Sequence, residues 1–188
     1  MLIQKIYNII FRSSIVFFLT ILLFSCTNDI KEVRDFLADK NLPIGISKNI
    51  YTVYKDSGRI TTKIKSPLFL DYSNRENHSY SEFPKGLHLT KIGYNGDSTT
   101  VTGNYAISYS KTQIAEIKDK VVVTNYANNY ILCTDQLFWD QEQHYFITEK
   151  KFTLMTPSDT LYGIGFESSE NLTNWHAKNN SGSLSVSE

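Results

Sequence analysis

Turn-forming residues interrupt the chain at short intervals from Asn49 onward, and this spacing limits the fold more than any other feature. The segments between the turns are rich in Tyr, Phe, Ile, Val and Thr, which suit the half-buried surface of a β-sheet. Gly and Asn in the turns accept the positive φ angles that hairpins require. The turn segments are Asp56-Ser57-Gly58, Asn95-Gly96-Asp97, Asn128-Asn129, 140–143 and 156–159. Many short strands joined by tight turns predict an all-β, antiparallel fold: a sandwich, a jelly roll or a barrel.

Apolar residues alternate within the expected strands, but the alternation slips within single strands. Leu132 is in phase with Thr134, whereas Leu137 is in phase with Trp139. One extra residue in the strand produces such a slip, so we predict a β-bulge between Thr134 and Leu137. The next strand repeats the pattern fourteen residues later, with Thr148 in the place of Thr134. Successive hairpins built on one template are the simplest explanation.

The N-terminal residues have the pattern of a secretory signal. Lys5 and Arg12 precede an apolar run from Ile15 to Phe24, and no acidic residue occurs before Cys26. The run is about ten residues long, whereas a membrane-spanning helix needs roughly 20. The segment Leu23-Phe24-Ser25-Cys26 resembles the lipobox of bacterial lipoproteins. We therefore expect residues 1–25 to be a signal peptide and Cys26 to be the lipid-bearing first residue of the mature chain; an uncleaved anchor helix is the alternative.

The segment after Cys26 is expected to connect the anchor to the folded domain. Ile30, Val33, Phe36 and Leu37 are spaced for one face of a short helix, and Pro43 disfavours helix in the residue before it. The prediction is a signal peptide over 1–25, an anchor, short helix and linker over 26–48, and a β-domain over 49–188. Removal of residues 1–25 changes the balance of basic and acidic residues from 19 against 19 to 17 against 19. This balance provides no basic surplus for nucleic-acid binding.

The sequence contains no recognisable catalytic or cofactor motif. The four histidines have no metal-ligand spacing, and there is no nucleotide-binding or nucleophile-elbow motif, so we expect no enzyme activity, cofactor or metal. Asp135, Asp140 and Glu149 could serve a small all-β hydrolase, although turns and solvent faces also collect acidic residues. Gly163 and Gly165 lie in an expected strand, where spaced glycines permit a bend or a close backbone approach.

Several short segments together resemble the LptC family, from about residue 50 to residue 186. The segments that carry the resemblance are Asp56-Ser57-Gly58, Ser66-Pro67, Phe83-Pro84-Lys85-Gly86-Leu87, Ala106, the stretch Ile117 to Asn125, Leu132-x-Thr134-x-x-Leu137-x-Trp139-Asp140, Gly163-Ile164-Gly165-Phe166 and Gly182. Each segment alone is weak, but their order, their spacing and their position behind a lipobox are specific. The chain is closest to the lipoprotein-type members of this family.

The resemblance implies a fold, a cargo and partners. The fold would be a twisted antiparallel jelly roll, open along one side, with an apolar interior groove. The protein would take lipopolysaccharide from the inner-membrane LptBFG ABC transporter and pass it to a periplasmic LptA-like bridge protein, while its lipid anchor holds it at the inner membrane on the periplasmic side. The residues expected to line the groove are Ala115, Ile117, Val121, Val123, Leu132, Leu137, Ile147, Phe152, Leu154 and Leu161. Each of these residues could equally fill a core without touching lipid.

Two features leave other interpretations open. Many LptC proteins keep an N-terminal transmembrane helix against the transporter, whereas Cys26 predicts that this chain loses it; the short helix around Val33 to Leu37 could substitute. The chain could instead be an unrelated surface lipoprotein whose β-sandwich binds a glycan or a protein. Exposed aromatic residues would serve a glycan-binding protein, and the candidates are Tyr51, Tyr54, Tyr72, Tyr80, Trp139 and Trp175.

Overall fold

The computed structural model describes residues 35–36 and 41–181 of the 188-residue chain. The chain divides into two compact units, Met1–Phe36 and Leu37–Glu188, and the second unit contains all the described strands. Cys26, the expected signal peptide and nearly all of the expected short helix lie outside the described residues. Within the described ranges, no helix has both the length and the apolar character needed to cross a bilayer.

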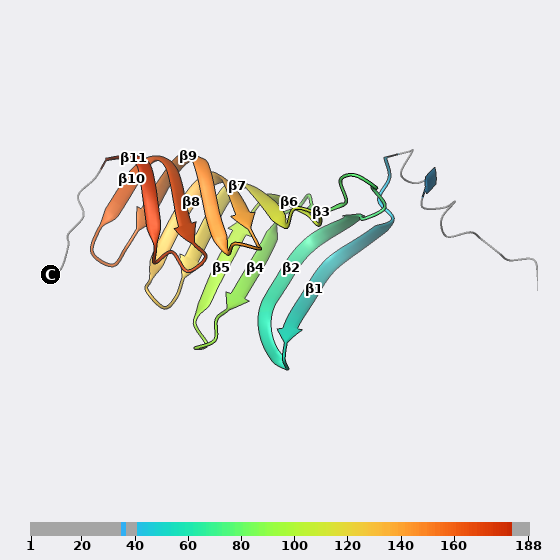
Figure 1. Ribbon diagram of the computed structural model, residues 1–188, viewed down its shortest axis with the longest axis horizontal. Coiled ribbons are helices and arrows are strands. Elements are labelled where there is room, and N and C mark those ends of the chain that lie inside the picture. Colours follow the sequence, from blue (N-terminus) through green and yellow to red (C-terminus); the bar gives the residue numbers. More distant parts are fainter. Residues whose placement is uncertain (1–34, 37–40, 182–188) are drawn as a thin grey trace, which may run out of the picture. The chain divides into compact units, whose positions relative to one another are not determined.

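The second unit is all-β, and its strands form a single antiparallel sheet (Figure 1). This architecture confirms the predicted fold class and is consistent with a jelly roll. The strands are β1 (Gly45–Asp56), β2 (Arg59–Tyr72), β3 (Tyr80–Phe83), β4 (Leu87–Ile92), β5 (Ser98–Gly103), β6 (Tyr105–Tyr109), β7 (Ile114–Asn125), β8 (Tyr130–Asp140), β9 (Tyr145–Met155), β10 (Thr160–Ser169) and β11 (Trp175–Ser181). Because β1 begins at Gly45, the last residues of the expected linker already pair with β2.

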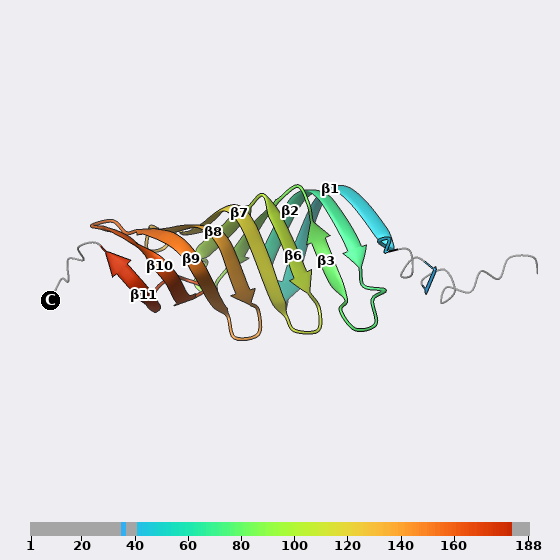
Figure 2. The ribbon, with the colours of Figure 1, turned by 90° about the horizontal axis from the view of Figure 1, so that it is seen from above.

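The sheet is an up-and-down meander in which long strands bend partway along their length. β7 pairs with β6 over its first half and with β5 over its second half, so β5 and β6 act as one strand broken at Asn104. β3 and β4 are related in the same way, because both pair with β2. If β3 and β4, and likewise β5 and β6, are counted as one broken strand each, every strand pairs with the next, and the chain advances along the sheet from β1 to β11 (Figure 2).

The bends fall where the pairing register shifts. Register shifts occur after Lys118 in β7, after Thr134 in β8 and after Ile164 in β10. An extra residue in one strand bends it and increases its twist. The shift after Thr134 falls where the alternation predicts a bulge, but the registers place the extra residue in the neighbouring strands β7 and β9. At this bend the hydroxyl of Thr134 lies 3.1 Å from that of Thr148 and donates to the carbonyl of Lys151.

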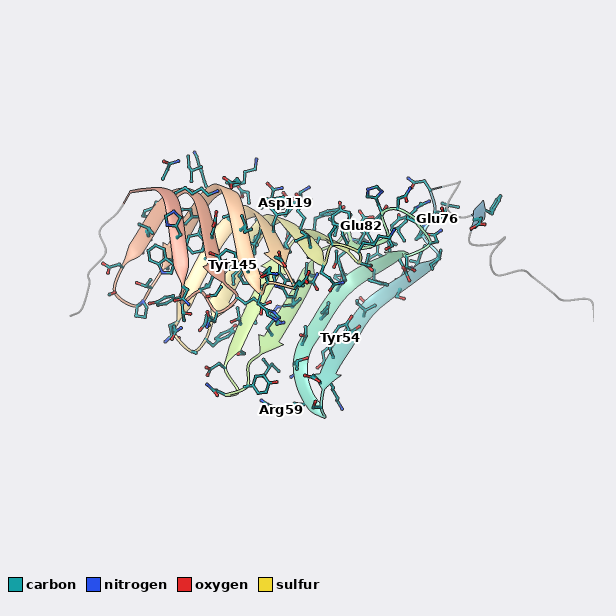
Figure 3. All side chains as sticks on the ribbon, viewed as in Figure 1. Tyr54, Arg59, Glu76, Glu82, Asp119 and Tyr145 are labelled. Carbon is teal, nitrogen blue, oxygen red and sulfur yellow. The ribbon has the colours of Figure 1, made fainter. Side chains whose placement is uncertain are left out.

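The bends divide the sheet into two layers that face each other. Layer A contains β4, β5 and the segments 50–56, 59–65, 121–125, 130–134, 151–155 and 160–164, and layer B contains β3, β6 and the segments 45–48, 68–72, 114–118, 137–140, 145–148 and 166–169. Phe152 of layer A packs against Phe166 of layer B, with ring centres 4.9 Å apart. The hairpin tips of layer A also contact one another, since the guanidinium of Arg59 lies 4.7 Å from the ring centre of Tyr94 (Figure 3).

An unbroken apolar row runs along the inner face of layer A. Strand pairing places its members side by side across seven strands: Ile64, Leu89, Val101, Val123, Leu132, Leu154 and Leu161. The last four are at most 1 % exposed. Burial of one such side chain contributes about 1.5–3 kcal/mol, so this row is a major part of the core. It also gives the interior a continuous apolar wall from β2 to β10.

Candidate lipid-binding groove

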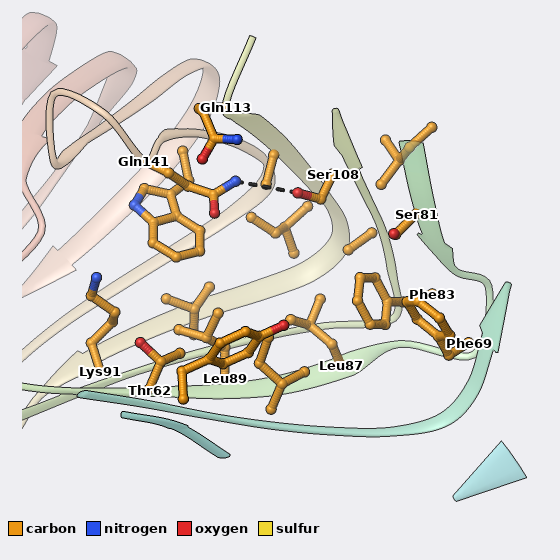
Figure 4. A pocket seen from close by; sticks show the side chains of 18 of the residues that line it. Thr62, Phe69, Ser81, Phe83, Leu87, Leu89, Lys91, Ser108, Gln113 and Gln141 are labelled. Atoms are coloured by element: carbon orange, nitrogen blue, oxygen red, sulfur yellow. Dashed lines mark hydrogen bonds between the residues drawn. The ribbon is translucent and has the colours of Figure 1, made fainter. Parts of the chain in front are cut away.

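A cavity of about 430 Å³ lies between the two layers in the part of the sheet formed by β1 to β8 (Figure 4). Apolar side chains from both layers make up most of its wall. They are Ile64, Phe69, Phe83, Leu87, Leu89, Val101, Ala106, Ile107, Ala115, Ile117 and Trp139. Phe69 and Phe83 close one end, with ring centres 5.4 Å apart. An apolar cavity of this kind favours a ligand with hydrocarbon chains over a hydrated polar one.

The larger polar side chains lie at the end of the cavity away from Phe69 and Phe83 (Figure 4). Gln141 donates from its side-chain amide to the hydroxyl of Ser108 at 3.2 Å, and Gln113 donates to the carbonyl of Ser110 at 2.7 Å. Figure 4 shows Gln113 and Gln141 on the wall opposite Lys91 and Thr62. Lys91 is the one charged residue among the described residues that line the cavity. The cavity is therefore amphipathic, with an apolar body and a polar end.

The structure places the predicted groove residues in two groups. Ala115 and Ile117 line the cavity. Seven others are buried in the closed part of the interior between the later strands, and these are Val121, Val123, Leu132, Leu137, Phe152, Leu154 and Leu161. Ile147 differs from all of them because it is only half-buried, between the fully inward Phe146 and Thr148. Since side chains alternate along a strand, Ile147 lies on the outer face of β9.

The sequence predictions missed most of the cavity wall. Phe83 and Leu87 flank the break between β3 and β4, and they belong to a segment that supported the family resemblance. Phe69, Leu89 and Val101 follow the same inward phase on β2, β4 and β5. Alternation could have identified these residues as inward-facing. It could not have shown that the layers separate here and close together further along.

The closed part of the interior narrows around β10. A side chain at Gly163 would place its Cβ 2.4 Å from the carbonyl oxygen of Asn179 and 2.6 Å from the ring of Phe152. Gly165 has a φ of 79° at the bend of β10, a conformation that favours glycine. These two glycines therefore allow β9, β10 and β11 to pack closely, and the interior beside them is filled.

The two ends of the sheet carry unpaired strand edges. Within residues 41–181, β1 pairs only with β2, and β11 pairs only with β10. Apolar side chains on β1 are exposed near its start, since Ile46 is 63 % exposed. An unpaired edge offers backbone donors and acceptors to a strand of another protein.

The acidic residues considered for catalysis do not form a site. Asp135 and Glu149 are exposed at the bends, and Glu149 binds Lys178, which raises the pKa of that lysine. Asp140 accepts backbone hydrogen bonds from Glu142 and Gln143, a turn role. Among the described residues, no group of three or more potential ligands could hold a metal ion.

The aromatic residues considered for glycan binding are not gathered on one exposed face. Trp139 is buried at the cavity, and Trp175 packs on Phe166. Tyr72 and Tyr80 stack on each other at 4.6 Å. Burial raises the pKa of Tyr80 above its ordinary value. Tyr51 and Tyr54 are exposed on β1, so the six candidates differ widely in exposure.

Comparison with known proteins agrees with the resemblance found in the sequence. The family model described as "Lipopolysaccharide-assembly, LptC-related" matches residues 14–180, which include β1 to β10 and nearly all of β11. A search of curated proteins finds no match. Proteins of the matching family take part in lipopolysaccharide transport, and they are periplasmic and associated with the inner membrane. The match covers most of the chain, and the chain therefore belongs to the LptC-related family.

Proposed function

We propose that this protein carries lipopolysaccharide across part of the periplasm. It receives the lipid from the LptBFG ABC transporter of the inner membrane and passes it to an LptA-like bridge protein. The observation that carries this proposal is the apolar interior between the two layers, which combines an open cavity with the apolar row from Ile64 to Leu161. Membership of the LptC-related family supports lipopolysaccharide as the cargo. The apolar interior between the two layers supports the way in which its acyl chains are held.

The cost of exposing acyl chains to water explains why such a carrier needs a covered interior. A chain of a dozen methylenes contributes about 10 kcal/mol of unfavourable hydration at ~0.8 kcal/mol per methylene. A transfer route must therefore keep the chains covered while the sugars stay in water. The cavity provides apolar walls and one polar end that includes Lys91 and Gln141. This division matches the two parts of a lipopolysaccharide molecule.

The free edges of β1 and β11 support a place within a longer bridge. A partner strand that pairs with either edge would extend the sheet by β-augmentation and join the two interiors. The sequence contains no Walker motif. The energy for transport would therefore come from the transporter, and this protein would supply a passive route.

The proposed anchor at Cys26 lies outside the described residues. Acylation at this thiol would replace a membrane-spanning helix, because two or three acyl chains hold a protein stably at a bilayer whereas one does not. Radiolabelled palmitate should label the wild-type protein in cells, and Cys26→Ser should abolish the label. Label that persists in the variant would contradict the anchor.

Depletion of the protein in growing cells tests the main proposal. Lipopolysaccharide should disappear from the cell surface and accumulate in the inner membrane, and a tagged copy should co-purify with an ABC transporter and a periplasmic bridge protein. Normal surface lipopolysaccharide after depletion would contradict the proposal. Capture of a glycan without transport proteins would favour the alternative of a surface lipoprotein.

A further inference from the structure

The loop between β10 and β11 contacts both layers of the sheet. Residues 170–174, here called the strap, form a turn of layer B, yet they contact the ends of two layer A strands. The side-chain amide of Asn125, at the end of β7, donates to the carbonyl of Asn171 at 2.8 Å. The carboxylate of Glu170 lies 3.6 Å from the ammonium of Lys91, near the end of β4. The strap therefore ties the two layers together across the open side of the sheet.

Leu172 holds the strap in a strained conformation. Its φ is 57°, and it is fully buried in the core. The other non-glycine residues with positive φ among the described residues are polar. A left-handed backbone conformation brings Cβ too close to the following carbonyl in an aliphatic residue. Burial of the leucine side chain must compensate for this strain. The packing of Leu172 therefore keeps the strap in place although the backbone of this residue disfavours the conformation.

Glu170 gathers three donor groups beside the cavity. Its carboxylate accepts a hydrogen bond from the indole Nε1 of Trp139 at 2.6 Å, and it lies 3.3 Å from Nδ1 of His144. Its third neighbour is Lys91, whose ammonium also lies 5.3 Å from the centre of the Trp139 ring. Both Lys91 and Trp139 line the cavity, and Lys91 extends from one wall towards the other in Figure 4. Lys91, which lines the cavity, is therefore held by the strap.

We propose that Lys91 is a subsite for a phosphate group of the cargo and that Glu170 competes with the phosphate for this lysine. This inference rests on the proposed lipid-carrying function. Lipopolysaccharide bears phosphates on the sugars that carry its acyl chains, so acyl chains in the cavity bring a phosphate to its polar end. A phosphate and a carboxylate repel each other at one ammonium group. Exchange of one anion for the other releases the strap and allows the layers to separate beyond Trp139, where the interior is closed.

Hydrogen exchange on the full-length mature protein tests this inference. The amide of Leu172 donates to the carbonyl of Ser169 at 2.9 Å, and its exchange rate reports strap opening. The probes are diphosphorylated lipid A and the same lipid after removal of both phosphates. The diphosphorylated lipid should accelerate exchange at Leu172 by about tenfold, within the usual range for coupled sites. The amide of Gly96, in the β4–β5 turn, should not change.

Substitution of Lys91 separates the phosphate effect from simple filling of the cavity. Lys91→Met should remove the difference between the two lipids, whereas Lys65→Met, at an exposed lysine outside the cavity, should retain it. Lipid binding without accelerated exchange at Leu172 would overturn the strap mechanism and leave the carrier function standing. Equal effects of the two lipids on the wild-type protein would overturn the phosphate subsite. Failure of both lipids to bind would overturn the carrier function and this inference together.

Discussion

Filling the cavity should weaken lipid binding without unfolding the protein. Ala106 is 2 % exposed on β6 and lines the cavity opposite the apolar row of layer A. Ala106→Leu adds three carbon atoms to a space of about 430 Å³. If these carbons displace three methylene groups of an acyl chain, binding loses ~2.4 kcal/mol, which is roughly a 60-fold increase in Kd. Because the cavity accepts the added volume, unfolding should become easier by less than about 1 kcal/mol, below the usual cost of overpacking a filled core.

Equilibrium binding of lipopolysaccharide and urea unfolding of the same protein measure both effects. Ala127→Leu is the matched control, since Ala127 is exposed in the β7–β8 turn and this substitution adds the same three carbons outside the cavity. The control should bind lipid as the wild type does. Unchanged affinity in a folded Ala106→Leu protein would refute the reasoning, because it would mean that acyl chains do not enter this cavity.

Three further predictions concern packing and reactivity. Leu132→Ala should lower the free energy of unfolding by about 2–5 kcal/mol. Leu89→Ala should lower it by less, because Leu89 already borders the cavity and has fewer contacts to lose. Equal losses in urea unfolding would contradict the division of the interior into an open cavity and a closed part. Gly163→Ala should destabilise the protein by about 1–3 kcal/mol because of its contacts with Asn179 and Phe152, while Gly93→Ala, whose Cβ would have only ordinary contacts, should be nearly neutral in the same assay. Burial raises the pKa of the Cys133 thiol, so iodoacetamide at pH 8 should alkylate it more slowly in the native protein than in urea, and equal rates would show that the thiol is not shielded.

Local pattern was enough to predict the strands and one of their bends. The alternation around Thr134 revealed the position of the register shift, because the irregularity leaves a visible slip in phase. Ile147 shows where the pattern fails. Tyr145, Phe146 and Ile147 form a continuous apolar and aromatic run, so alternation alone does not say which of them face inward. The equivalence of Thr148 with Thr134 already favoured an inward Phe146 and an outward Ile147, as the structure shows.

The cavity and the strap depend on contacts that sequence patterns do not report. Leu89 borders the cavity and Leu132 fills the core, yet the two are members of one row with the same chemistry. Only the local separation of the layers distinguishes them. Glu170 and Leu172 lie in a turn, where sequence reasoning expects solvated residues, and their partners Lys91 and Trp139 come from distant strands. Long-range contacts of this kind become visible only in the folded chain.

Photo-crosslinking in growing cells tests most directly whether the interior carries lipid. A crosslinking amino acid would replace Leu89 in the cavity and Val123 further along the same row, and it would replace their outward-facing neighbours His88 and Val122 as controls. We expect lipopolysaccharide adducts at Leu89 and Val123, and none at His88 or Val122. Adducts confined to the two outward positions would contradict the interior route.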